Sequence, residues 1–284
     1  MQKYSMSGQQ IMIGRKTLTR IIANCDFGDV RAGTYGGFIE DTRNLSFQGN
    51  CWVADQAIVF GDARISKNAV IGGMAIAKDY VVVTDNAYVG DDVLLAQSAY
   101  IGGNAILKCS TYVNGAATIL GNVRAYCIAF RSNSGKTLMP NITGCARIID
   151  DAILEGRINV RDYVTIGGHA YISGRARLLE LASVDDFAVI EGFANISGRA
   201  RITGHAHIRD RSRITNDAFV GGHALVIGKS LVTGKAYMSG LTKLHNQTLS
   251  GDQYLSSTAN GWLITQNGKE FFIHDSATVP TTCY

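Results

Sequence analysis

Histidine and arginine are concentrated in the segment ARITGHAHIRDRSRI, residues 200–214, which contains His205, His207 and four arginines. A neutral imidazole can take a proton from a hydroxyl or an amine near neutral pH. Guanidinium groups bind phosphates and carboxylates through paired hydrogen bonds. The segment therefore suggests either a general base beside an anion site or a basic surface, and the element that carries these residues decides between the two.

The segment belongs to a six-residue repeat that runs without a slip over 164–241. The third position of each hexad is almost always Val, Ile or Leu, the first is usually Ala, and the fifth is mostly Gly, Asp or Asn. The second block reaches back to Pro140, and an earlier block runs from Leu45 to Ile128. Inward side chains at alternate positions followed by a turn residue predict a short strand and a corner, and the spacing of a helix is absent.

Read from its third position, the hexad resembles the hexapeptide repeat [LIV]-[GAED]-x-x-[STAV]-x of left-handed parallel β-helices. IGGNAI (101–106), IGGHAY (166–171) and VGGHAL (220–225) fit that pattern fully. The resemblance covers about two thirds of the chain. It implies an all-β protein, a single-stranded left-handed parallel β-helix of about ten coils with three hexads in each. It also implies capped ends, because an open terminal coil exposes a sheet edge.

The repeat and its interruptions predict five segments. These are an N-terminal β cap (1–38), a first solenoid block (39–128), an inserted loop (129–139), a second solenoid block (140–240) and a C-terminal cap (241–284). In the first cap we expect strands at Gln10–Ile13 and Leu18–Asn24. In the last we expect a β-hairpin over 261–273 that turns at Asn267–Gly268, with Trp262, Phe271 and Phe272 covering the final coil.

Residues 26–65 carry a more specific resemblance. They contain DFGDVRAGTYGGF followed by LSFQGNCWV, which is similar to the N-terminus of the bacterial and phage-associated YdcK-type β-solenoid proteins. The matching positions are Phe27, Asp29, Val30, Gly33, Gly36, Gly37, Leu45, Gly49, Cys51 and Trp52. That family is called a transferase largely because of its fold, so the resemblance implies architecture more than activity.

A histidine column follows if each coil has eighteen residues, since His169, Phe187, His205 and His223 then stack on one corner. Hexapeptide acyltransferases generally use one histidine as a general base, with acyl-CoA bound along the edge of the solenoid. The resemblance thus implies His205 or His223 as the catalytic base, and acetyl-CoA or another acyl-CoA as co-substrate. The alternative is a sixth position that is simply exposed and polar. Phe187 interrupts the column, so we expect no metal site.

A basic ladder is expected on the next corner, where Arg175, Phe193, Arg211 and Lys229 would stack with Arg157. Such a ladder could bind the phosphates of CoA, a polyanionic glycan or nucleic acid. Interspersed acidic residues and sparse exposed aromatics argue against nucleic acid. Lys136 in the inserted loop is a further anion-binding candidate. Its SGKT sequence is not a P-loop, because Phe130 stands where a glycine is required.

Two functions remain open. The regular repeat favours a binding or scaffold protein that needs no cofactor and presents flat faces to a protein partner or to itself, a homotrimer being one such arrangement. An apolar patch of Phe219 and Tyr237 would suit that role. The alternative is an acyl-CoA-dependent acetyltransferase. We expect no signal peptide, because no apolar stretch follows a basic one near the N-terminus, and no apolar run approaches membrane-spanning length. We expect a cytoplasmic protein with Cys109 and Cys127 as free thiols.

Overall fold

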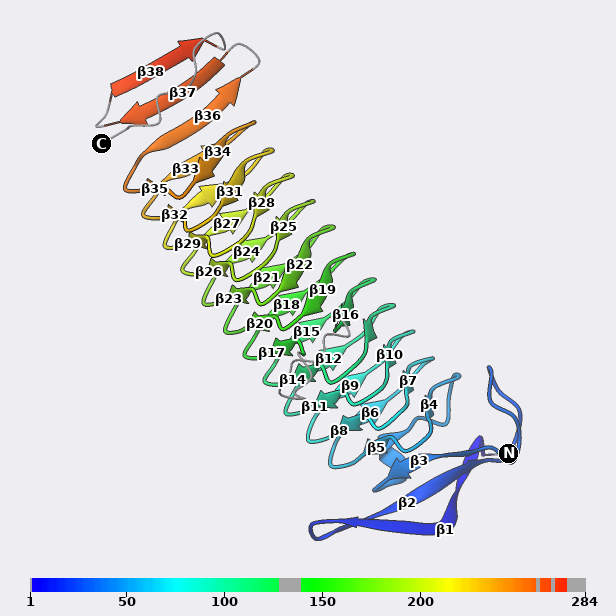
Figure 1. Cartoon of the computed structure of the whole chain (residues 1–284). Coiled ribbons are helices and arrows are strands. Elements are labelled where there is room, and N and C mark those ends of the chain that lie inside the picture. Colours follow the sequence, from blue (N-terminus) through cyan, green and yellow to red (C-terminus); the bar gives the residue numbers. More distant parts are fainter. Residues whose placement is uncertain (1, 128–138, 259–260, 267–268, 275–284) are drawn as a thin grey trace. The chain divides into compact units, whose positions relative to one another are not determined.

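The computed structural model describes residues 2–127, 139–258, 261–266 and 269–274, with side chains as far as Ser257. The chain divides into two compact units, Met1–Asp162 and Tyr163–Tyr284. Most strands in both units have only two residues and are joined by short corners (Figure 1). The one helix among the described residues is the 3₁₀ turn Thr42–Asn44. No described helix is long and apolar enough to cross a membrane.

Strands in the first unit pair in parallel with strands one coil away. Val89, for example, pairs with Ile71 and with Leu107. Each of those partners lies eighteen residues from Val89, so one coil contains three hexads and the unit has three faces, which we call faces 1, 2 and 3. The predicted all-β parallel β-helix is confirmed, and the sequence alone had shown only the six-residue period.

The solenoid strands of the first unit lie on these faces. Face 1 contains β4 (Trp52–Val53), β7 (Val70–Ile71), β10 (Tyr88–Val89), β13 (Ile106–Leu107), β16 (Arg124–Tyr126) and β19 (Ile153–Gly156). Face 2 contains β5 (Ile58–Val59), β8 (Ile76–Ala77), β11 (Leu94–Leu95), β14 (Tyr112–Val113), β17 (Asn141–Ile142) and β20 (Asn159–Val160). Face 3 contains β6 (Arg64–Ile65), β9 (Val82–Val83), β12 (Tyr100–Ile101), β15 (Thr118–Ile119) and β18 (Arg147–Ile148).

The second unit repeats the same coil, with its faces labelled in the same order. Face 1 contains β22 (Tyr171–Gly174), β25 (Val189–Ile190), β28 (His207–Ile208), β31 (Leu225–Ile227) and β34 (Lys243–His245). Face 2 contains β23 (Arg177–Leu178), β26 (Asn195–Ile196), β29 (Arg213–Ile214), β32 (Leu231–Val232) and β35 (Thr248–Leu249). Face 3 contains β21 (Thr165–Ile166), β24 (Ser183–Val184), β27 (Arg201–Ile202), β30 (Phe219–Val220), β33 (Tyr237–Ser239) and β36 (Tyr254–Thr258).

The interior of each unit is filled by the first and third positions of the hexads. Ala200, Ile202, Ala206 and Ile208 are fully buried, as are their counterparts in almost every described coil. Small and branched residues suit this interior because successive coils stack at the spacing of sheet strands, about 4.8 Å. The second, fourth and sixth positions are left to form the surface.

The corners have the left-handed backbone that the fifth-position residues predict, together with a hydrogen bond that the hexad pattern did not predict. The fifth residue adopts a left-handed backbone, with φ of 60° at Asp85 and 65° at Gly103. The Asp85 carboxylate accepts the N–H of Gly103, one coil later, at 2.9 Å. Asp210 accepts the N–H of Gly228 in the same way. Fifth-position acids therefore satisfy the corner N–H groups of the next coil, besides tolerating the left-handed conformation.

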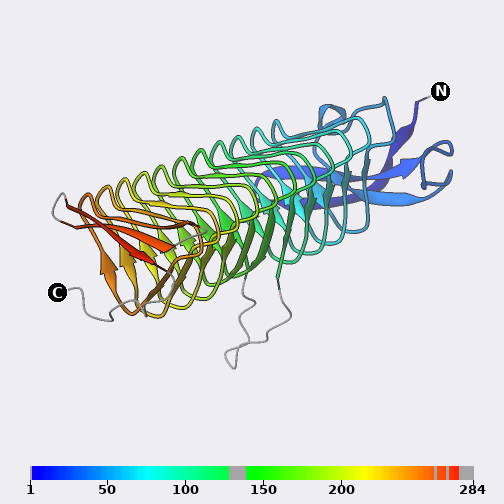
Figure 2. The same ribbon diagram turned by 90° about the horizontal axis from the view of Figure 1, so that it is seen from above.

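The caps are built from longer, antiparallel strands. In the first unit β1 (Tyr4–Ile13) pairs with β2 (Lys16–Ala23), and β2 pairs with β3 (Tyr35–Ile39). The two expected N-terminal strands are present, and β1 begins six residues earlier than predicted. In the second unit β36 pairs with β37 (Gly261–Gln266), which pairs with β38 (Lys269–His274) (Figure 2). The Asn267–Gly268 turn and the side chains of Trp262, Phe271 and Phe272 lie outside the described part of the chain.

The expected number of coils, about ten, was too low, because the described residues of the two units form about twelve turns. In the incomplete first turn β3 pairs with β5 and Leu45 with Ile65. Leu45 was assigned to the first solenoid block, whereas nearly all of β3 was assigned to the N-terminal cap. Tyr112 pairs with Asn141 rather than with a residue eighteen positions later. One coil therefore contains an insertion between β16 and β17, although most of the predicted 129–139 loop, with Lys136, lies outside the described residues.

Candidate functional site

The histidine column forms on one corner of the second unit, as the eighteen-residue coil requires. The His169 and Phe187 ring centroids are 4.8 Å apart, those of Phe187 and His205 are 4.9 Å apart, and those of His205 and His223 are 4.7 Å apart. The planes of His205 and His223 differ by only 2°. The column forms because the left-handed fifth residues, Gly204 and Gly222 among them, turn each sixth side chain outward.

The histidines of the quoted segment differ in what they contact. His207 points outward from face 1, and its Nε2 lies 2.9 Å from the Glu191 carboxylate. The rings of His205 and His223 are exposed, and among the described residues their ring nitrogens make no hydrogen bond or ion pair. The ring nitrogens of His205 and His223 are therefore open to solvent, whereas Nε2 of His207 already contacts a carboxylate. Within the described residues no cluster of three metal-ligating side chains forms.

An aromatic column runs along face 3 of the same unit. The Phe219 and Tyr237 ring centroids are 4.7 Å apart, and those of Tyr237 and Tyr254 are 4.6 Å apart. The Phe219 ring lies over Gly221, where an added Cβ would come within 2.7 Å of it. The stacking of Phe219 on Tyr237 agrees with their predicted spacing. Tyr254 was missed because it comes one residue early, after the corner that follows β34.

Basic side chains occupy a different corner of the second unit. The Arg175 and Arg211 guanidinium carbons lie 5.4 and 5.9 Å from the centroid of the Phe193 ring. Lys229 occupies the equivalent sixth position one coil later. The strands of face 1 separate this corner from the histidine corner, so the structure does not join the predicted base and the predicted anion-binding residues into one compact site.

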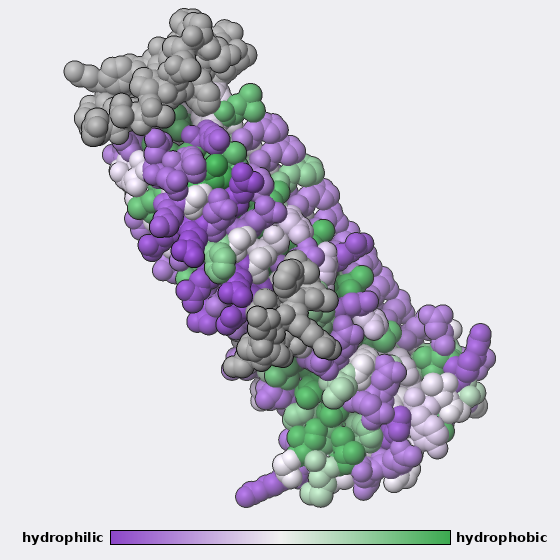
Figure 3. All heavy atoms as spheres, viewed as in Figure 1, coloured by the Kyte–Doolittle hydropathy of each residue, from purple (hydrophilic) through white to green (hydrophobic). Residues whose placement is uncertain are grey.

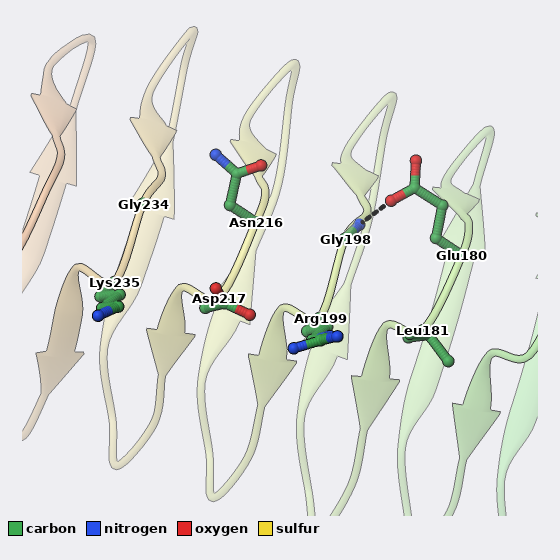
Figure 4. A pocket seen from close by; sticks show the side chains of 8 residues that line it. All are labelled: Glu180, Leu181, Gly198, Arg199, Asn216, Asp217, Gly234 and Lys235. Carbon is green, nitrogen blue, oxygen red and sulfur yellow. Dashed lines mark hydrogen bonds between the residues drawn. The ribbon is translucent and has the colours of Figure 1, made fainter.

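A shallow groove of about 520 Å³ follows the third corner of this unit (Figure 4). Arg199, Asp217 and Lys235 extend from the same corner of successive coils, and Glu180 accepts the N–H of Gly198 at 2.7 Å. None of the predicted site residues lines this groove. Its charges alternate in sign, so it has no marked preference for an anion or a cation.

Cys109 and Cys127 are adjacent free thiols in the first unit. The Cys109 sulfur accepts the backbone N–H of Cys127 at 3.2 Å. Burial, together with the neighbouring Cys109 thiol, raises the pKa of Cys127 to about 12. A thiol with a raised pKa carries little thiolate, so Cys127 is not an activated nucleophile.

A buried lysine in the N-terminal cap was not predicted. The Lys3 ammonium group donates to the carbonyls of Gly49 and Cys51 and lies 3.3 Å from the Cys51 sulfur. It also lies 5.0 Å from the centroid of the Phe27 ring. Burial is the main cause of a raised pKa at the Cys51 thiol. These contacts attach the residue just before β1 to the first coil. The pattern in residues 26–65 did not predict them, because Lys3 lies outside that segment.

No family model matches the chain. A curated relative, the uncharacterized acetyltransferase YdcK of Escherichia coli strain K12, is 47% identical over 77 residues. The match covers 24% of this chain and 24% of the relative. It confirms the resemblance to the YdcK-type proteins, and it spans only about a quarter of that relative's length.

Among solved structures, LpxA from Acinetobacter baumannii has a TM-score of 0.41 and 12% identity, over 74% of this chain and 71% of that one. UDP-N-acetylglucosamine O-acyltransferase (LpxA) from Moraxella catarrhalis has a TM-score of 0.33 and 16% identity, over 72% of each chain. Likenesses at these scores carry no weight for the site or its chemistry.

Proposed function

We propose that this protein is an acyltransferase that uses acetyl-CoA or another acyl-CoA as donor. The observation that carries the proposal is the stretch of 47% identity to a protein described as an acetyltransferase. The second unit supports it with two exposed imidazoles, those of His205 and His223, whose nitrogens are unengaged among the described residues.

The proposed reaction needs one base. The imidazole of His205 or His223 takes a proton from the hydroxyl or amine of the acceptor as that group attacks the thioester carbonyl. The carbon–sulfur bond breaks, the acyl group passes to the acceptor, and the departing thiolate takes up the proton. His207 is not proposed as the base, because its Nε2 already contacts Glu191.

The corner before His223 is closely packed. The ring of Phe219 fills the space beside Gly221, and the backbone of Gly240 lies against Gly222. In this proposal the acyl donor therefore approaches the exposed ring edges of His205 and His223 and not the backbone of that corner. In the same proposal Arg175, Arg211 and Lys229 are not the partners of the acyl group, because they lie on another corner.

A binding experiment tests the donor. The melting temperature of the full chain is measured with and without millimolar acetyl-CoA, in the wild type and in His205→Asn and His223→Asn variants. We expect a rise in the wild type that is smaller in both variants, and a rise unchanged in His207→Asn. The proposal fails if acetyl-CoA leaves the wild-type melting temperature unchanged.

A second candidate function, a scaffold that associates with itself, is favoured by an apolar face in the first unit. Ile58, Ile76 and Leu94 are half-exposed and lie in register on β5, β8 and β11. Figure 3 shows this hydrophobic area over those strands. Exposed apolar patches commonly mark interfaces. Sedimentation of the wild type and of the Ile76→Lys variant tests this role. The wild type should form an oligomer, for example a trimer, and the variant should be a monomer.

A further inference from the structure

One edge of the second unit is strongly basic. We define the basic edge as the exposed side chains around the corner between faces 1 and 2, which are Arg175, Arg177, Arg209, Arg211, Arg213 and Lys229. Within the described residues none of these six side chains makes an ion pair or a hydrogen bond. Unpaired guanidinium groups gathered on one edge have their donors free for an external ligand.

The carboxylates near the basic edge are already engaged. Asp210, between Arg209 and Arg211, accepts the N–H of Gly228 at 2.9 Å. Glu191 contacts His207 at 2.9 Å. Asp210 and Glu191 keep their negative charges, but they are two carboxylates against the six cationic side chains of the basic edge. The other acidic residues in the coils of the second unit lie on other corners. The edge keeps a local excess of positive charge.

The arginines of the basic edge recur at a fixed interval. Arg175 and Arg211 lie one coil before and one coil after Phe193, so their guanidinium groups stack on opposite sides of its ring. On face 2, Arg177 pairs in register with Asn195, which pairs with Arg213. Arg175 and Arg211 thus form one row of arginines on the corner, and Arg177 and Arg213 form a second row on face 2. In each row the two arginines are two coils apart, about 10 Å along the unit.

The geometry points to the basic edge as a binding strip for an acidic polysaccharide. An extended polysaccharide with one carboxylate or sulfate in each disaccharide repeats its charge over about the length of two coils. Each charged group could then meet a guanidinium fork, with hydrogen bonds from two nitrogens. This strip is separate from the proposed acyl transfer, since none of its residues lies on the corner of His205 and His223.

Nucleic acid fits the basic edge less well. Proteins that bind single strands without sequence preference stack the bases on exposed aromatic rings. The ring of Phe193 is the one aromatic group within the two arginine rows, and guanidinium groups stand beside both of its faces. The strip therefore offers charge at a regular spacing without a surface for bases.

Binding of defined oligomers tests the proposal. The full chain is titrated with fluorescent hyaluronate oligosaccharides, which carry one carboxylate per disaccharide, and with oligothymidylate of equal charge, at several salt concentrations. The test variants are Arg175→Gln/Arg211→Gln and Arg177→Gln/Arg213→Gln. The matched control, Arg199→Gln/Arg201→Gln, removes the same charge from the same unit away from the basic edge. Circular dichroism and melting curves show whether each variant is folded.

We expect hyaluronate to bind the wild type, and each test variant to lose roughly tenfold in affinity while the control stays within about twofold. The slope of log affinity against log salt should fall by about two in each test variant. The proposal is overturned if the wild type does not bind hyaluronate at low salt, or if the control loses as much affinity as the test variants. Tighter binding of oligothymidylate than of hyaluronate also overturns it.

Discussion

The imidazole rings of His205 and His223 lie face to face, with centroids 4.7 Å apart and planes within 2° of parallel. Eighteen residues separate them, so the stack exists only because the coil brings equivalent corners together. Phe187 lies against the other face of His205 at 4.9 Å. The stacking fixes the orientation of the rings, and their exposed edges carry the nitrogens that the proposed chemistry needs.

The column predicts which substitutions at His205 the fold tolerates. His205→Phe keeps a flat ring between Phe187 and His223, so its free energy of unfolding should stay near that of the wild type. His205→Ala removes two stacked contacts and should cost about 1–2 kcal/mol. Urea unfolding followed by circular dichroism measures both. Arg199→Ala, at the same hexad position on another corner, serves as control, and equal losses in the two His205 variants would contradict the stacking account.

Two glycines with similar backbone angles predict a difference in stability. Gly14 has φ of 60° in the β1–β2 turn and nothing within 4 Å of an added Cβ, whereas at Gly103 (φ 65°) a Cβ would lie 2.6 Å from the Gly121 nitrogen. Gly14→Ala should lower the free energy of unfolding by about 1–2 kcal/mol, because the alanine must adopt the left-handed conformation. Gly103→Ala should cost about 1–3 kcal/mol more, because one coil would be forced away from the next. Equal urea midpoints for the two variants would contradict this packing.

A ladder of side-chain amides runs up one corner of the first unit. Asn68 donates to Asn86 and Asn86 to Asn104, each at 3.0 Å, and Asn104 donates to Asn122 at 2.8 Å. Asn86→Ala breaks two of these bonds and should lower the free energy of unfolding by about 1–2 kcal/mol. Met74→Ala, at an exposed corner position, should change it little. A loss no larger in Asn86→Ala than in Met74→Ala would show that the ladder contributes nothing.

The N-terminal cap predicts a pH dependence of stability. Hydrogen bonds from the Lys16 ammonium and the Gly61 N–H hold the pKa of Glu40 below its ordinary value of 4.5. The unfolded chain therefore takes up this proton first as the pH falls. The stabilisation is complete above pH 4.5, decreases below it, and is lost once the pH falls through the folded pKa.

Glu40→Gln should be less stable than the wild type at pH 6, and the difference should shrink toward low pH. Urea midpoints measured from pH 6 to pH 2 provide the comparison. A difference that stays constant over that range would contradict the role given to Glu40.

Much of the fold could be predicted from the sequence because each position of the hexad has one structural role. Ile202 and Ile208 fill the interior in the way that their spacing required. The first turn was predicted only in part, because Leu45 lies in the repeat but β3 lies in irregular sequence that was assigned to the N-terminal cap. Tyr254 was missed because a corner one residue short shifts it out of phase.

The site could be predicted only in part. Spacing placed His205 on a different corner from Arg211, but it could not show that Glu191 engages His207 or that Asp210 serves the Gly228 N–H. Those contacts join residues of neighbouring coils through side-chain conformations that a periodic pattern does not contain. The contact of Lys3 with Cys51 joins residues far apart in the sequence, and no repeat connects them.

The most direct test of the central claim is the release of free thiol from acetyl-CoA in the presence of amine and hydroxyl acceptors. We predict acceptor-dependent release by the wild type and a loss of at least about a hundredfold in the folded His205→Phe/His223→Phe variant. His207→Asn should retain most of the activity. The account would be contradicted if the wild type released no thiol with any of those acceptors, or if the double variant kept full activity.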